Sequence, residues 1–171
     1  MKIKLFGIDF ILEYSFLLML SFGIILGAED IASLLLFSSL HELGHFAALM
    51  ICGGRADSLT FSFYGLALKY STVLSTGKET LVLIAGPLVN LALYLVLRDD
   101  INLLLFVINM MPIYPIDLGR IIRLYNYKIS KILGVITLII LVALSLFLLI
   151  FYKSFSLIFI VCYLIVYSIN Y

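Results

Sequence analysis

The residues of this chain best suited to chemistry are His41, Glu42 and His45, in the segment His41-Glu42-Leu43-Gly44-His45. Residues four apart lie on one face of a helix, so the two imidazoles can point at a single metal ion. Glu42 follows His41 directly and can take a proton from a water at that ion. This His-Glu-x-x-His spacing is typical of zinc hydrolases, in which the glutamate is the general base. The sequence therefore predicts His41 and His45 as ligands of one Zn²⁺ per chain, and Glu42 as the base.

The alternative is that two histidines fell at helical spacing by chance. They are the only histidines in the chain, and apolar residues flank them at 34–37 and 46–51. An ionisable group inside the hydrocarbon of a membrane costs about 2.5 kcal/mol or more. Three such groups within five residues favour a functional site over chance.

Composition indicates why the surroundings are apolar. Hydrophobic residues make up 64% of the chain and charged residues 12%, which is typical of an integral membrane protein. A net charge of +1 and the lack of a basic run exclude a nucleic-acid-binding protein. Two cysteines in apolar settings predict reduced thiols rather than a disulfide framework. We expect one membrane-embedded domain over residues 1–171.

The elements that must position the site are predicted to be mostly helical. The fold class is an all-α polytopic membrane protein with six transmembrane helices and a small β-hairpin or sheet near the active site on the cytoplasmic side. The spans are expected at about 14–27, 31–52, 79–97, from 101 onward, 130–151 and 154–170, with a basic loop over 120–131. The last two spans look like scaffold, and the catalytic core covers about 1–125.

Two segments favour strands. Residues 2–13 alternate polar and apolar side chains around Gly7, and residues 56–71 alternate with period two on both sides of Gly65. The first predicts a strand pair at the membrane surface. The second predicts a hairpin, with a loop of accidental alternation as the alternative. A bare sheet edge cannot face lipid, so the hairpin must lie at the interface or line a cavity.

Two further helices carry polar or disruptive residues at membrane depth. The third contains Gly86-Pro87 and Asn90, where a packing kink is as good an explanation as a functional role. The fourth runs through Asn109 into Pro112 and Pro115, which end regular helix before Asp117. Candidate substrate-binding residues are Asn90, Asn109, Phe61 and Phe63.

Charge predicts the orientation. In the six-span arrangement nine basic residues fall on one side and two on the other, which places both termini in the cytoplasm. The nine are Lys2, Lys4, Arg55, Lys69, Lys78, Arg120, Arg123, Lys128 and Lys131, and the two are Arg98 and Lys153.

Depth brings Asp117 into consideration. At 1.5 Å per residue, His41 lies about 15 Å below the outer surface, His45 about 21 Å and Asp117 about 24 Å. Catalytic zinc sites commonly use three protein ligands plus a water. Asp117 is therefore predicted as the third ligand, the alternative being a helix-end acid paired with Arg120 or Arg123.

With these residues in place, the chain resembles the site-2 protease family of intramembrane zinc metalloproteases. The matching segments are His41–His45, Gly86-Pro87-Leu88-Val89-Asn90, and Asn109-x-x-Pro112-x-x-Pro115-x-Asp117-x-Gly119, in the family's order. The six-span layout without a PDZ insertion is most similar to the branch of the stage IV sporulation protein FB. The chain has Asp117-Leu118-Gly119 where the family usually has Asp-Gly-Gly, and it does not show the CBS domain of many relatives.

The resemblance implies a metalloendopeptidase in the cell membrane that cleaves a membrane-associated protein in or near its spanning segment. Members of the sporulation branch release transcription-factor precursors, so such a precursor is the implied substrate, and a membrane regulatory partner is a further candidate. The same site would fit an extended peptide, which the edge of the hairpin could bind by strand addition.

Other functions are less consistent with the sequence. A transporter would be expected to show repeated halves or more polar residues along a path. A catalytically silent relative would have lost Glu42 or a ligand. A CAAX-type protease would supply a later glutamate as third ligand, and no acidic residue follows Asp117.

Overall fold

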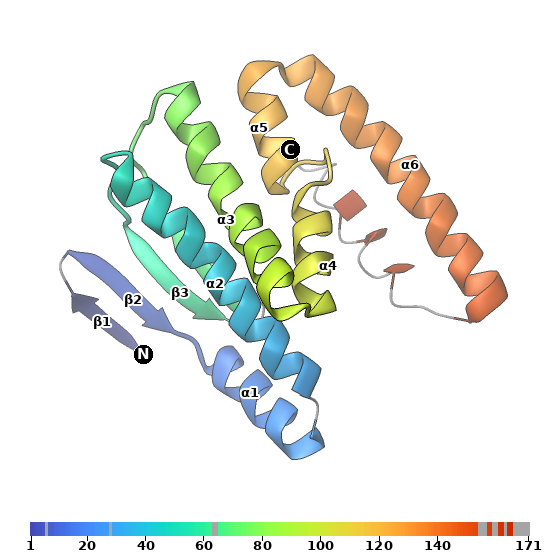
Figure 1. Ribbon diagram of the computed structural model, residues 1–171, viewed down its shortest axis with the longest axis horizontal. Coiled ribbons are helices and arrows are strands. Elements are labelled where there is room, and N and C mark those ends of the chain that lie inside the picture. The colour runs from blue at the N-terminus through green and yellow to red at the C-terminus, as the bar shows by residue number, and fades with distance from the viewer. Residues whose placement is uncertain are drawn as a thin grey trace. The chain divides into compact units, whose positions relative to one another are not determined.

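The computed structural model describes residues 1–5, 7–27, 29–62, 65–153, 157–158, 161–162 and 164–165. The chain divides into two compact units, Met1–Ile108 and Asn109–Tyr171. The two histidines and the sheet belong to the first unit, whose elements are drawn in blue to yellow in Figure 1.

The described residues form six helices of very different length. They are α1 (Tyr14–Leu26), α2 (Glu29–Ile51), α3 (Thr76–Leu97), α4 (Asp100–Asn109), α5 (Asp117–Tyr125) and α6 (Tyr127–Tyr152). The predictions for α1, α2, α3 and α6 are confirmed to within three residues at each end. Of the predicted span at 154–170, the structure describes residues 157–158, 161–162 and 164–165, which are helical, and the rest lies outside the described residues.

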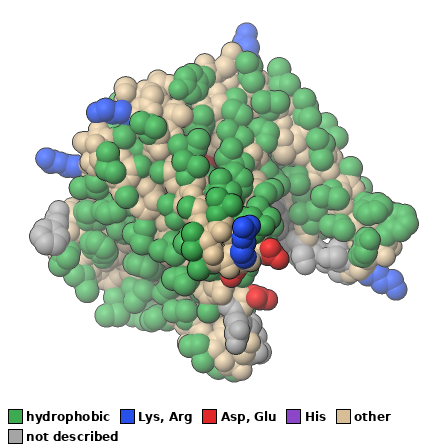
Figure 2. All heavy atoms as spheres, in the orientation of Figure 1, with side chains coloured by type: hydrophobic (Ala, Val, Ile, Leu, Met, Phe, Trp, Pro, Cys, Tyr) green, Lys and Arg blue, Asp and Glu red, His purple; other side chains and the backbone are tan. Residues whose placement is uncertain are grey.

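Three of these helices are long and apolar enough to cross a membrane. They are the helices over Asp30–Ile51, Thr76–Leu97 and Tyr127–Tyr152, whereas α1 and α4 are shorter apolar helices. Apolar side chains cover much of the face shown in Figure 2, and the lysine and arginine side chains stand on it singly. Long apolar helices with an apolar exterior are what a membrane protein requires, because only lipid removes such a surface from water.

The strands form one four-stranded sheet. Its order is β1 (Lys2–Leu5), β2 (Ile8–Leu12), β3 (Ser58–Ser62) and β4 (Gly65–Lys69). The antiparallel pairs β1/β2 and β3/β4 confirm both predicted strand pairs. A parallel pairing of β2 with β3 joins them, which the sequence did not predict. β3 has a partner on each side, so β4 is an edge strand of the sheet. This edge strand contacts α2 through a hydrogen bond from Leu68 to Glu42.

The prediction of a loop over residues 120–131 is wrong. Residues Asp117–Tyr125 form α5, and α6 begins at Tyr127 after a cap in which the Asn126 side chain accepts from the Ile129 N–H. Basic residues favoured a loop in the prediction. Arg120 and Arg123 are, however, three residues apart with apolar residues between them, which is the spacing of one polar face of an amphipathic helix. The guanidinium of Arg123 lies over the ring of Tyr114, 4.2 Å from its centroid.

Close packing of α2 against α3 positions the candidate site. A Cβ on Gly44 would lie 2.8 Å from Cγ2 of Val89 and 3.0 Å from the carbonyl oxygen of Ala85, so only glycine permits this approach. One turn further along α2, Leu49 is fully buried with Val82 of α3. The two helices are thus held at a fixed separation on both sides of His45.

Candidate metal centre

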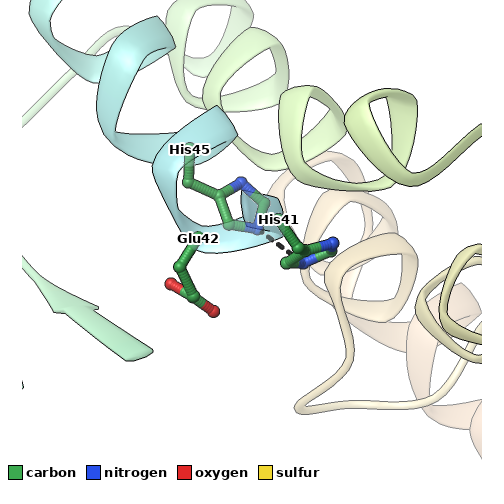
Figure 3. A group of neighbouring side chains, drawn as sticks. All are labelled: His41, Glu42 and His45. Atoms are coloured by element: carbon green, nitrogen blue, oxygen red, sulfur yellow. Dashed lines mark hydrogen bonds between the residues drawn. The ribbon is translucent and has the colours of Figure 1, made fainter. Parts of the chain in front are cut away.

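The imidazoles of His41 and His45 face each other on α2. Their Nε2 atoms are 3.1 Å apart, and each side chain is 6% exposed. Figure 3 shows the rings turned toward one another, with the Glu42 carboxylate beside them. The helical spacing therefore brings the two rings together, as the sequence predicted, and one ligand atom from each of the three residues lies within 4.8 Å of the others.

The ring of His45 is oriented by a backbone group of α3. Its Nδ1 is 2.7 Å from the carbonyl oxygen of Val82. A carbonyl can only accept, so Nδ1 carries the proton and the lone pair of the neutral ring is on Nε2. This is the arrangement of a histidine whose Nε2 binds a metal.

The ring of His41 is contacted by a side chain of α3. Nδ2 of Asn90 is 3.3 Å from Nδ1 of His41, and Asn90 is completely buried. Between these two contacts, α3 presents Gly86. A Cβ there would lie 2.7 Å from Nε2 of His41 and closer still to Nε2 of His45, so the missing side chain leaves room at the two candidate ligand atoms.

Glu42 is held by the sheet rather than by α3. The N–H of Leu68, on the edge strand β4, donates to Oε2 of Glu42 at 3.2 Å. This hydrogen bond shows that the Leu68 N–H points toward α2 rather than into the ladder with β3. The sheet thus positions the carboxylate that the sequence predicted as the base.

The donor set fits a zinc ion. Two nitrogen ligands of tetrahedral zinc, each at about 2.0–2.1 Å, stand about 3.3 Å apart, close to the separation of the two Nε2 atoms. The His45–Val82 hydrogen bond and the space left by Gly86 add the support and the room that a metal needs. Imidazole is a usual zinc ligand.

The third predicted ligand, Asp117, and one predicted substrate contact, Asn109, belong to the second unit. Asp117 is the first residue of α5 and is 7% exposed, so it is a buried acid at a helix N-terminus. Asn109 is the last residue of α4 and is partly buried. Their functional roles remain predictions.

The remaining predicted substrate contacts, Phe61, Phe63 and Asn90, lie in different settings. Phe61 lies on β3, an inner strand, its carbonyl accepts from the Glu13 N–H, and its ring packs against Phe16. Its backbone is therefore already paired and cannot bind a further strand. Phe63 lies outside the described residues. Asn90 is fully buried against His41, and its contact with a substrate remains a prediction.

Two contributors to the site could not be found from residue types. The Val82 carbonyl and the Leu68 N–H are backbone groups. Nearly every residue has both groups, so the residue type gives no signal for either contact. Ala85 and Gly86, about one turn after Val82, indicate close helix packing, but only the structure shows which carbonyl contacts His45.

The overall fold is similar to that of a solved protease. The Site-2 Protease from Methanocaldococcus jannaschii superposes with a TM-score of 0.65, covering 99% of this chain and 94% of that one. The two sequences are 24% identical, so this likeness establishes the fold.

The sequence comparisons are more limited. No family model matches the chain. A curated protein from Synechocystis sp., provisionally named as a zinc metalloprotease, is 29% identical over 166 residues, which is 74% of this chain. The match spans 44% of that relative's length, so less than half of the relative is represented here.

Proposed function

We propose that this chain is an intramembrane zinc metalloprotease that hydrolyses a peptide bond in or near the spanning segment of a membrane-associated protein. The observation that carries the proposal is the His41–Glu42–His45 cluster, buried on a helix apolar enough to span the membrane. The fold shared with a site-2 protease and the name of the Synechocystis relative support the same class.

The proposed mechanism assigns a task to each residue of the cluster. His41 and His45 would hold the ion through Nε2. When bound, zinc supplies a Lewis acid that polarises the peptide carbonyl and lowers the pKa of water toward about 7. Glu42 accepts a proton from the attacking water and delivers it to the leaving amine as the C–N bond breaks. The Leu68 N–H keeps the carboxylate in place for both transfers.

Asp117 is the proposed third ligand. It is the first residue of α5, where the N-terminus of a helix stabilises a negative charge. Asp117→Asn removes the negative charge with little change of shape, so zinc affinity and activity should fall together. Full zinc affinity in that variant would assign the third ligand to another group.

The edge strand β4 is the proposed place for an extended substrate. Alternate residues of an edge strand direct their N–H and C=O groups outward, so Leu66 shares the outward side with Leu68. Because the Leu68 N–H already binds Glu42, a peptide paired at Leu66 would approach the proposed base along the strand.

This placement predicts the effect of Leu66→Pro. Proline removes one outward N–H while keeping the ladder to β3, as edge strands tolerate. We expect cleavage to fall by about tenfold, the equivalent of one hydrogen bond of about 1.4 kcal/mol, with zinc content unchanged. Leu66 is 4% exposed, so Leu66→Ala, which also removes its buried side chain but keeps the N–H, is the control. Equal cleavage by both variants would exclude strand addition at Leu66.

The orientation is proposed from charge, with both termini in the cytoplasm and a six-span layout. Cysteine labelling of intact cells tests it, using Lys128→Cys and Asp99→Cys in a background with Cys52 and Cys162 replaced by Ser. Reagent from outside should label position 99 and spare position 128. Labelling of both positions from one side would overturn the layout.

We also propose a finer assignment from the sequence motifs, namely the sporulation branch of the site-2 proteases and a membrane-bound transcription-factor precursor as substrate. The matching His41–His45 segment and the Asn109-to-Gly119 segment support it.

The function is tested by metal removal. The purified protein in lipid nanodiscs is offered a set of single-span peptides with helix-breaking residues, in water enriched in ¹⁸O. Cleavage should place ¹⁸O in the new C-terminal carboxylate, stop on chelation and return with Zn²⁺ but not Mg²⁺. Cleavage that persists in the metal-free protein would contradict a zinc peptidase.

A further inference from the structure

The two histidines contact different kinds of group on α3. Val82, Gly86 and Asn90 are four residues apart and form one stripe of that helix. Val82 meets His45 through a carbonyl, and Asn90 meets His41 through a side-chain amide. A carbonyl can only accept, whereas an amide can donate through Nδ2 or accept through Oδ1 after rotation by 180°.

Three contacts around the two rings fit one proton arrangement. Val82 fixes the proton of His45 on Nδ1, so His45 Nε2 accepts from His41 Nε2 at 3.1 Å. His41 then has its lone pair on Nδ1, which accepts from Nδ2 of Asn90 at 3.3 Å. In this state Oδ1 of Asn90, buried with 0% exposure, has no hydrogen-bond partner among the described residues.

This arrangement cannot bind a metal between the rings, because His41 Nε2 carries a proton. Ligation through Nε2 of both rings requires the proton of His41 to move to Nδ1. Asn90 must then present Oδ1, the atom that now lacks a partner. The rotation needs no change in the shape of the side chain, since the two ends of the amide are nearly equal in size.

We propose that Asn90 is a positioning residue that selects the tautomer of His41, donating through Nδ2 without metal and accepting through Oδ1 when the ion binds. The inference rests on the proposed zinc site and replaces the predicted substrate role of Asn90. It explains why a fully buried amide is kept at this position of an apolar helix with one of its polar atoms unpaired, a situation that otherwise costs stability.

The chain is well suited to a direct test, because His41 and His45 are its only histidines. With ¹⁵N-labelled histidine, all imidazole signals in solid-state NMR come from these two rings. Protonated and unprotonated ring nitrogens have well-separated ¹⁵N shifts. We expect His45 to be protonated on Nδ1 with and without zinc, and His41 to change from Nε2–H to Nδ1–H when zinc is added.

Two variants separate the role of the amide from its bulk. Asn90→Asp has only acceptors, so His41 should be protonated on Nδ1 even without zinc. Asn90→Leu has neither donor nor acceptor, so zinc should bind about 10–100-fold more weakly, as for other supporting contacts of ligands. Asn102→Leu is the matched control, since Asn102 is equally buried and its amide has no partner among the described residues. Its zinc affinity should equal that of the wild type.

The outcomes distinguish this inference from the proposed function. If the wild type binds no zinc, the proposed metal site fails and the inference fails with it. If the wild type binds zinc but Asn90→Leu binds it equally well, the inference alone is overturned. Should Asn90→Leu fail to fold, Asn90→Asp decides, because His41 remaining Nε2–H in that metal-free variant would also overturn the proposal.

Discussion

Replacing Gly86 with Ala is expected to weaken metal binding strongly while leaving the chain helical. The added Cβ would lie 2.7 Å from Nε2 of His41 and closer to Nε2 of His45. The methyl group can be accommodated only if the imidazoles move or α3 withdraws from α2, and both change the space between the ligand atoms. We expect zinc affinity to fall by about 100-fold or more. Loss of a residue that supports a metal ligand typically lowers metal affinity by about 10–100-fold, so this is the upper end of that range or beyond it. The measurement is competition with a chromophoric chelator.

Gly77→Ala is the control for this variant. Gly77 lies on the same helix, and a Cβ there would meet no atom within 4 Å. Alanine also favours helix over glycine by about 0.8–1.0 kcal/mol, so Gly77→Ala should be no less stable than the wild type and should bind zinc normally. Normal zinc affinity in Gly86→Ala would mean that the ion does not lie at the two Nε2 atoms.

Replacing Glu42 with Gln is expected to lower the rate of cleavage by about 10²–10⁴-fold, the usual contribution of a general base. The amide keeps the shape of the side chain but cannot take a proton from water. Its carbonyl can still accept from the Leu68 N–H, so the local structure should persist. The rate is measured with the single-span peptides used for the wild type.

The same variant separates two roles that the geometry allows. The Glu42 carboxylate is close enough to both imidazoles to be counted with them as a possible ligand. As a base it can be lost without loss of zinc, whereas as a ligand it cannot. We expect about one zinc per chain in Glu42→Gln, as in a site whose ligands are intact. Glu13→Gln, at an exposed glutamate, should change neither rate nor zinc content.

The helices and the metal-binding pattern could be predicted because each rests on local periodicity. Residues 41 and 45 share a helical face whatever the rest of the chain does, and long apolar runs define α2, α3 and α6. The two strand pairs were visible for the same reason, since alternation around Gly7 and Gly65 is local.

What the sequence did not reveal depends on contacts between distant segments. The parallel pairing of β2 with β3 joins residues nearly fifty positions apart, and it places Phe61 inside the sheet and Leu66 at its edge. The role of the Leu68 N–H follows from that pairing and has no signal in the residue type. Asn90 was recognised as an unusual residue, but only its contact with His41 indicates what it does.

X-ray absorption at the zinc edge of the purified wild-type protein tests the central claim most directly. If His41 and His45 hold a catalytic zinc ion, the spectrum should show two imidazole ligands at about 2.0–2.1 Å, with oxygen ligands completing the shell. A sulfur ligand at about 2.3 Å, or a shell without imidazole, would contradict the account.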